Sequence, residues 1–239
     1  MNAFSGYSHE TFEFFMAIRF NNNRDFFHAN HAWYERSVRR PSVLLAEALQ
    51  DTVFDIDPDL EVRPNRAVSR INRDIRFSRD KSPYRDYIWL HYRRPAEEHG
   101  PIPAFYFDIG SGEEVSCGMG FYSQNKPMLN ALKHVILTDP DRLREVIAPL
   151  QGKYTFFGDF YKRLAIPDRV PEDLRAWYAV KNFYFQKQSR DMDLITSPAL
   201  ADWVKEGFHD LAPLYHFLMN LTPLDELPSD DVSAPTRND

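Results

Sequence analysis

The apolar residues near both ends of the chain follow helical spacing. Between residues 8 and 20 they recur every three or four positions, and Ser8 stands where a helix N-cap is expected. Asn21 to Asn23 interrupt this stripe, and Asn22 with Asp25 predicts a corner into a second helix. The last stripe begins at Ser197-Pro198 and consists of Leu200, Val204, Phe208, Leu211, Tyr215 and Leu218.

Between about residues 62 and 122 the pattern changes from helical to alternating. Three segments alternate clearly and predict strands: 87–92, 104–109 and 115–122. Gly110-Ser-Gly112 is a short turn of the hairpin type, so an antiparallel meander is expected. Residues 67–74 are predicted to join this sheet, although arginine at every third position also fits one face of a helix.

Helical signals return after the strands, at 127–137 and again after Asp139-Pro140. Helices, then strands, then helices predicts an α+β fold with a mainly antiparallel sheet, packed by N-terminal and C-terminal helices. One domain is expected over residues 1–222. Residues 223–239 are acidic, proline-containing and poor in apolar side chains, so we expect a disordered tail.

Composition favours an ordinary globular protein of the cytoplasm. Of the 239 residues 43% are hydrophobic, which supplies a core, but no run approaches the roughly 20 apolar residues that cross a bilayer. No membrane partner and no export signal are expected. The single cysteine, Cys117, cannot form an intramolecular disulfide and is predicted to be a small apolar residue within a strand.

Positive charge is concentrated in one part of the chain. Residues 63–94 contain ten Lys/Arg and three Asp, a local charge of +7 in a chain whose net charge is −6. Such a contrast predicts a negatively charged ligand. The acidic tail holds four of the six net negative charges, so the folded body is nearly neutral, and nucleic acid is not the expected partner.

The arginine-rich run at residues 69–84 therefore supplies the candidate site. Arginine offers a fixed fork of donors that matches carboxylate and phosphate. The candidate ligand-binding residues are Arg70, Arg73, Arg76 and Lys81. If the protein is an enzyme, Asp74 or Asp80 is the candidate for proton transfer and Tyr84 for a donor. Pro83 is expected to fix a turn that presents Lys81 and Tyr84 at the mouth of the cluster.

Other interpretations of the same run stay open. In the alternative hypothesis the carboxylates neutralise the arginines in a structural salt-bridge lattice, and the protein is a non-catalytic interaction protein that binds an acidic partner. A third hypothesis has the acidic tail fold over the basic run. No metal or cofactor is expected, because His28 with His31 and His209 with His216 lack a third ligand at a recognised spacing. The pattern makes no prediction about oligomeric state.

The run RINRDIRFSRDKSPY at residues 70–84 resembles the hallmark of a bacterial and fungal family, domain of unknown function 2461. Asn21 to Phe27 followed by Tyr34, and the strand 118–122, are similar to further features of that family. The resemblance covers roughly residues 4–190 and implies no activity. Phe26, Pro41 and residues 165–185 depart from its usual pattern, and Pro41 predicts a kink or restart in the second helix. The matched positions are Arg70, Arg73, Asp74, Arg76, Phe77, Asp80, Lys81, Pro83 and Tyr84.

Overall fold

A computed structural model describes residues 3–76, 79–95 and 102–228. The predicted α+β class is confirmed: one five-stranded antiparallel sheet carries helices from both ends of the chain. The strand order is β1-β2-β3-β5-β4. The strands are β1 (Tyr87–Tyr92), β2 (Ala104–Gly110), β3 (Val115–Phe121), β4 (Thr155–Phe160) and β5 (Val180–Ser189).

The described chain groups into two compact units. Unit 1 takes its residues from 1–95, 105–118 and 187–209, and unit 2 from 96–104, 119–186 and 210–239. The division falls within β3 and β5, which is why no linker is visible in the sequence. The predicted extent of the domain, 1–222, stays a prediction.

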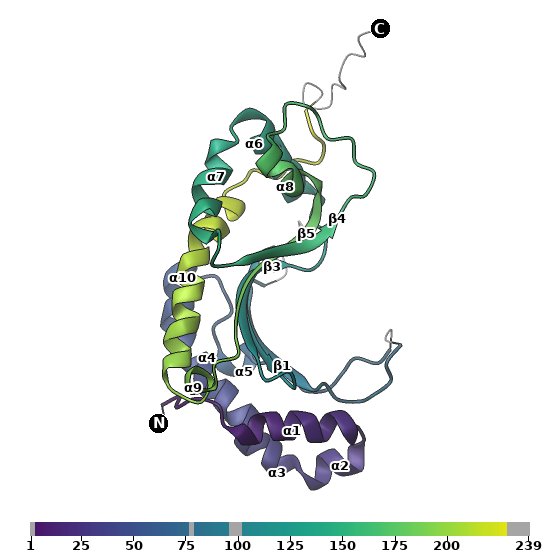
Figure 1. Cartoon of the computed structure of the whole chain (residues 1–239), viewed down its shortest axis with the longest axis vertical. Coiled ribbons are helices and arrows are strands. Elements are labelled where there is room, and N and C mark those ends of the chain that lie inside the picture. Colours follow the sequence, from purple (N-terminus) through teal and green to yellow (C-terminus); the bar gives the residue numbers. More distant parts are fainter. Residues whose placement is uncertain (1–2, 77–78, 96–101, 229–239) are drawn as a thin grey trace. The chain divides into compact units, whose positions relative to one another are not determined.

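Unit 1 begins with a run of helices that lie side by side in Figure 1. Ser8 caps the first helix as predicted, and its N–H donates to the Thr11 hydroxyl. The corner predicted after it is present, but Asn23 rather than Asn22 caps the next helix, because its side chain accepts the Phe26 N–H at 2.9 Å. The helices are α1 (His9–Phe20), α2 (Arg24–Ala29), α3 (His31–Tyr34), the π-helix η1 (Glu35–Arg39), α4 (Arg40–Ile56) and α5 (Pro64–Ala67).

Pro41 restarts the helix rather than merely bending it. It lies in the first turn of α4, directly after the π-helical turn of η1. Proline has no N–H to donate to the preceding turn, so it is tolerated at a helix start and not within a helix.

The core of unit 1 lies against one face of β1 and β2. The stripe predicted for the last helix, α10 (Ala199–Met219), is buried at all six positions. Its Phe208 ring lies 5.1 Å from that of Phe105 and 5.9 Å from that of Tyr92. On the same sheet face, Tyr7 stacks on Phe107. Cys117 is a buried strand residue, as predicted.

Unit 2 contains β4 and β5, which the sequence did not predict. Phe183 and Phe185 of β5 are buried, and β4 packs beside them through Phe156, which stacks on Trp177 at 4.6 Å. Most β4 side chains are at least partly exposed, so this strand has no clear alternation. The other elements between β3 and α10 are α6 (Lys126–Thr138), α7 (Asp141–Ile147), η2 (Ala148–Leu150), η3 (Glu172–Leu174), α8 (Arg175–Ala179) and α9 (Met192–Ile195).

Residues 67–74 form neither the strand nor the helix considered for them. After α5 the chain makes two isolated antiparallel bridges, Val68 with Leu90 and Asn72 with Tyr84. The buried residues Val68 and Ile71 are three positions apart, so they do not give the two-residue alternation of a continuous strand.

The tail predicted from residue 223 begins in contact with unit 2. The Leu224 N–H donates to the Pro127 carbonyl at 3.1 Å, and the Asn130 side chain donates to the carbonyls of Leu224 and Asp225. Residues 229–239 lie outside the described residues, so the disorder of that part and its folding over the basic run stay predictions. None of the described helices is long and apolar enough to cross a membrane.

Gly120 allows β3 to approach β5 closely. A Cβ at Gly120 would lie 2.1 Å from the Phe183 carbonyl oxygen, whereas a Cβ at Gly112 would meet nothing closer than 3.7 Å. We expect Gly120→Ala to lower the free energy of unfolding by about 2 kcal/mol or more, since the backbone must shift. Gly112→Ala is the matched control. Similar urea midpoints for both variants would contradict the close approach.

Candidate functional site

The arginine-rich run folds as one long loop between α5 and β1. We call its described residues, 69–76 and 79–86, the arginine loop; Figure 1 shows it projecting beyond the end of β1. Its two arms are joined at the base by backbone hydrogen bonds of 2.8 Å, from Ser69 to Trp89, Arg73 to Pro83 and Arg85 to Ile71. The loop is therefore a projection with a defined base.

Asn22 fixes the returning arm of the loop to the corner between α1 and α2. Its amide nitrogen donates to the Tyr84 carbonyl at 2.9 Å, and its amide oxygen accepts the Tyr84 N–H at 3.0 Å. The Tyr84 ring stacks on Phe27 with centroids 4.3 Å apart. These contacts connect two motifs that lie 62 residues apart in the sequence.

Tyr84 is placed differently from the prediction. It is 4% exposed and its ring packs on Phe27, so it does not stand at the mouth of the cluster. Packing the two rings together removes their apolar faces from water, which is favourable. The tyrosine anchors the loop by packing.

Arg85 stabilises the loop through hydrogen bonds to its backbone. One of its guanidinium nitrogens donates to the carbonyls of Arg70 and Asn72, at 2.8 and 2.6 Å. The same guanidinium lies 4.6 Å from the centre of the Trp89 ring. Among the described residues, no neighbouring strand donates hydrogen bonds to these two carbonyls. The guanidinium of Arg85 donates them instead.

Arg73 lies at the base of the loop and is only 22% exposed. Its Nη1 is 3.3 Å from the Asp80 carboxylate, and its Nη2 reaches the Tyr84 carbonyl at 3.5 Å. Its Nε is buried and has no hydrogen-bond acceptor among the described residues. Such a buried unsatisfied donor costs about 1–3 kcal/mol unless a partner arrives.

The other candidate side chains are spread along the loop. Arg76 forms a two-pronged ion pair with Asp74 at 2.7 and 3.0 Å, and both side chains are largely exposed. Lys81 donates to the Ile75 carbonyl at 2.8 Å. Arg70 is exposed, and its guanidinium contacts no described hydrogen-bond acceptor. The arginines thus do not converge on one enclosed cavity.

Both loop carboxylates are held in the ionised state. The Arg76 hydrogen bond lowers the pKa of Asp74 to about 2, and hydrogen bonds from Ser82 lower the pKa of Asp80. An efficient general base at neutral pH has a pKa near 7. The geometry therefore favours charge pairing over proton transfer for these two groups.

The sequence did not single out Asp108, a carboxyl group of unit 1 whose pKa is raised. It lies on β2 opposite Trp89 of β1 and accepts a short hydrogen bond from the Ser116 hydroxyl. Burial raises its pKa to about 6, with a further contribution from Glu114. Asp108 alternates with the buried Phe107 and Ile109 and so lies on the opposite face of β2, where the sequence pattern gives no signal of its partial burial.

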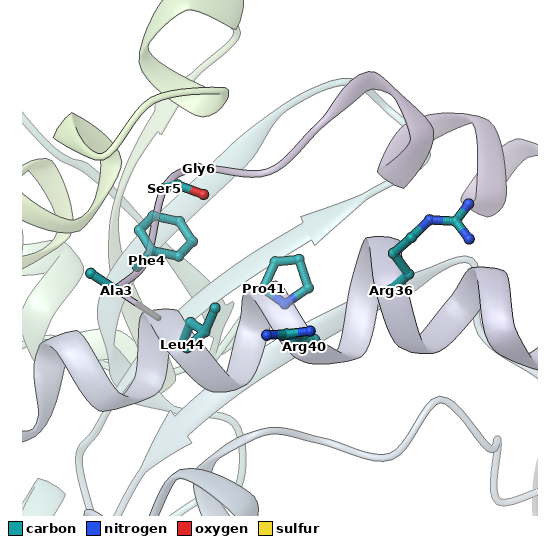
Figure 2. A pocket seen from close by; sticks show the side chains of 8 residues that line it. All are labelled: Ala3, Phe4, Ser5, Gly6, Arg36, Arg40, Pro41 and Leu44. Carbon is teal, nitrogen blue, oxygen red and sulfur yellow. The ribbon is translucent and has the colours of Figure 1, made fainter. Parts of the chain in front are cut away.

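An open cavity of about 550 Å³ lies elsewhere in unit 1, between the N-terminal segment and α4. Figure 2 shows that its two arginines do not converge: Arg36 points away from Phe4, and Arg40 lies below Pro41 in this view. Arg36 is already held by Glu10 at 2.9 Å. No group of three or more His, Cys, Asp or Glu within the described part of the chain is placed to hold a metal ion.

We expect Asn22→Ala to loosen the arginine loop. The variant loses both hydrogen bonds to Tyr84 and leaves its backbone groups unpaired, at a cost of about 1–3 kcal/mol. Hydrogen exchange should accelerate at residues 70–76 and 79–85. Asn21→Ala is the control, because that side chain bonds only to the Ala17 carbonyl of its own helix. Equal exchange in both variants would argue against the role of Asn22.

Asp108 should make stability depend on pH. Folding raises the pKa of Asp108 from an ordinary 3.8 to about 6. The contribution of this group to the free energy of unfolding is therefore fully present below pH 3.8 and is lost as the pH rises through 6. The free energy of unfolding of Asp108→Asn, taken relative to that of wild type, should therefore increase by about 3 kcal/mol between pH 4 and pH 7.5. Urea unfolding of both proteins at the two pH values measures this. A difference that does not change with pH would refute the shift.

The comparison with known families agrees with the motif. The model of a family described as conserved hypothetical protein (DUF2461) matches residues 10–217, which includes Asn22, the arginine loop and nearly all of α10. This match extends further toward the C-terminus than the 4–190 expected. A search of curated proteins finds no match. The chain belongs to the DUF2461 family of conserved hypothetical proteins.

Proposed function

We propose that the arginine loop binds a small anionic ligand, a phosphate ester or a carboxylate, through Arg73 and Arg70. The observation that carries this proposal is the buried Nε of Arg73, which has no acceptor among the described residues. Guanidinium binds oxyanions through Nε and Nη together. An oxygen atom of the ligand would supply the missing acceptor.

The ion pair between Arg73 and Asp80 leaves room for such a ligand. The pair is 3.3 Å long, and the Asp80 side chain is 53% exposed. Asp80 also accepts hydrogen bonds from the N–H and hydroxyl of Ser82, at 2.9 and 2.6 Å. An incoming anion can therefore replace Asp80 at Arg73 without leaving that carboxylate unsatisfied.

The remaining basic residues have different parts in this proposal. Arg70 is exposed at the base of the loop and is available for a second contact. Arg76 is engaged by Asp74 and Lys81 by the Ile75 carbonyl, so both contribute mainly to the local positive field. We assign no reaction, because the low pKa values of Asp74 and Asp80 suit ion pairing.

An acidic segment of a partner protein is a second candidate ligand. The loop projects from unit 1, and its outer basic side chains are exposed at Arg76, Arg79 and Lys81. An extended acidic segment would contact these residues along the loop, whereas a small anion would contact only the base. The two candidates thus differ in which arginines matter.

Thermal unfolding with inorganic phosphate, citrate and phosphoserine tests the small-anion proposal. Binding at ten times Kd should stabilise wild type by about 1.4 kcal/mol. Arg73→Ala should abolish this gain, and Arg73→Lys should weaken it, since lysine keeps the charge but lacks the planar fork. Arg76→Ala removes the same charge from the same loop and should retain the gain.

Two outcomes would count against the small-anion proposal. The first is wild type that shows no stabilisation by any of these anions. The second is equal loss in the Arg73 and Arg76 variants, with steep salt dependence, which would favour an acidic partner instead.

A further inference from the structure

Lys133, in unit 2, is a buried lysine without a counter-ion. It lies on α6 and is 9% exposed. Its ammonium makes no hydrogen bond or ion pair with a described residue. Its neighbours are two aromatic rings, Tyr161 at 5.4 Å and Tyr178 at 5.5 Å from Nζ to the ring centres.

These surroundings disfavour the ammonium ion relative to an exposed lysine. Removing an ammonium from water is costly, and two cation–π contacts return only part of that cost. Burial accordingly lowers the pKa of Lys133. A neutral amine carries a lone pair and attacks carbonyl carbon, whereas an ammonium ion does not.

A second lysine contacts the same tyrosine ring. The Lys181 nitrogen is 4.8 Å from the centre of the same Tyr161 ring, so the two nitrogens lie no farther apart than the sum of their distances to it. The Tyr161 hydroxyl accepts a hydrogen bond from Gln124, which fixes the ring. Lys181 thus provides a second positive charge around the Tyr161 ring, which an anionic substituent can contact.

We propose that Lys133 is a reactive amine that condenses with a small aldehyde or ketone bearing an anionic group, and that Lys181 binds this group. The amine nitrogen attacks the carbonyl carbon, and the carbonyl oxygen takes up protons and leaves as water. The products are an imine and one water molecule, with no change of oxidation state. This site is independent of the arginine loop, which belongs to unit 1.

Labelling with pyridoxal phosphate, an aldehyde that carries a phosphate, tests the proposal. Brief reaction with less than one equivalent at pH 7.5, followed by borohydride, converts the imine into a stable secondary amine that peptide mass spectrometry can locate. We expect Lys133 to carry at least about ten times more label than Lys205. Lys205 is the reference because Asp202 holds it at 3.1 Å on the surface helix α10.

Pyridoxal without phosphate tests the part of Lys181. Pyridoxal should label Lys133 several-fold more slowly than pyridoxal phosphate does. In Lys181→Met, the rate at which pyridoxal phosphate labels Lys133 should fall to the rate for pyridoxal. These comparisons use folded wild type first, so they do not depend on whether Lys133→Met folds. Label on exposed lysines with none on Lys133, or equal rates for both aldehydes, would overturn the proposal. Neither result depends on anion binding by the arginine loop.

Discussion

The contact between Asn22 and Tyr84 determines where the arginine loop can stand. The loop has only isolated bridges to the sheet, so its own backbone pairing is sparse. The Asn22 amide donates to and accepts from one residue, as a neighbouring strand would, and Phe27 packs on the ring of that residue. Arg85 satisfies carbonyls on the other arm. A highly charged segment with little apolar surface is thereby kept in one conformation.

Ion pairs within the arginine loop neutralise part of its charge and still leave one arginine donor for the proposed ligand. Asp74 neutralises Arg76 two residues away, and Asp80 is held by Ser82 at the same spacing. Exposed pairs of this kind contribute little to stability, about 0–1 kcal/mol. Arg73 also pairs with Asp80, but its Nε keeps no acceptor among the described residues. Ion pairs of the kind expected in the rival interpretation are thus present in the loop, and they leave this one donor unsatisfied.

The two cationic sites differ in the chemistry that their side chains permit. Guanidinium stays protonated at all accessible pH values, so Arg73 suits the binding of an anion. Burial lowers the pKa of an amine, and Lys133 is buried among aromatic rings without a described counter-ion. The first site therefore fits recognition, and the second fits covalent chemistry. Asp108 is a third titratable group of this kind: its partial burial raises the pKa of the carboxyl group and so favours the neutral form.

The sequence by itself determined the α+β class, the helical stripes, three strands and the arginine run, because one-sided burial imposes a local period of 3.6 or 2 residues. Tertiary structure decided the rest. The partly exposed β4 has no such period, and Asn22 meets Tyr84 only because folding brings together residues 62 positions apart. The burial of Tyr84 and the missing counter-ion of Lys133 depend likewise on neighbours from distant segments. Periodicity reports how a residue faces the core, and it carries no information on which residue it meets there.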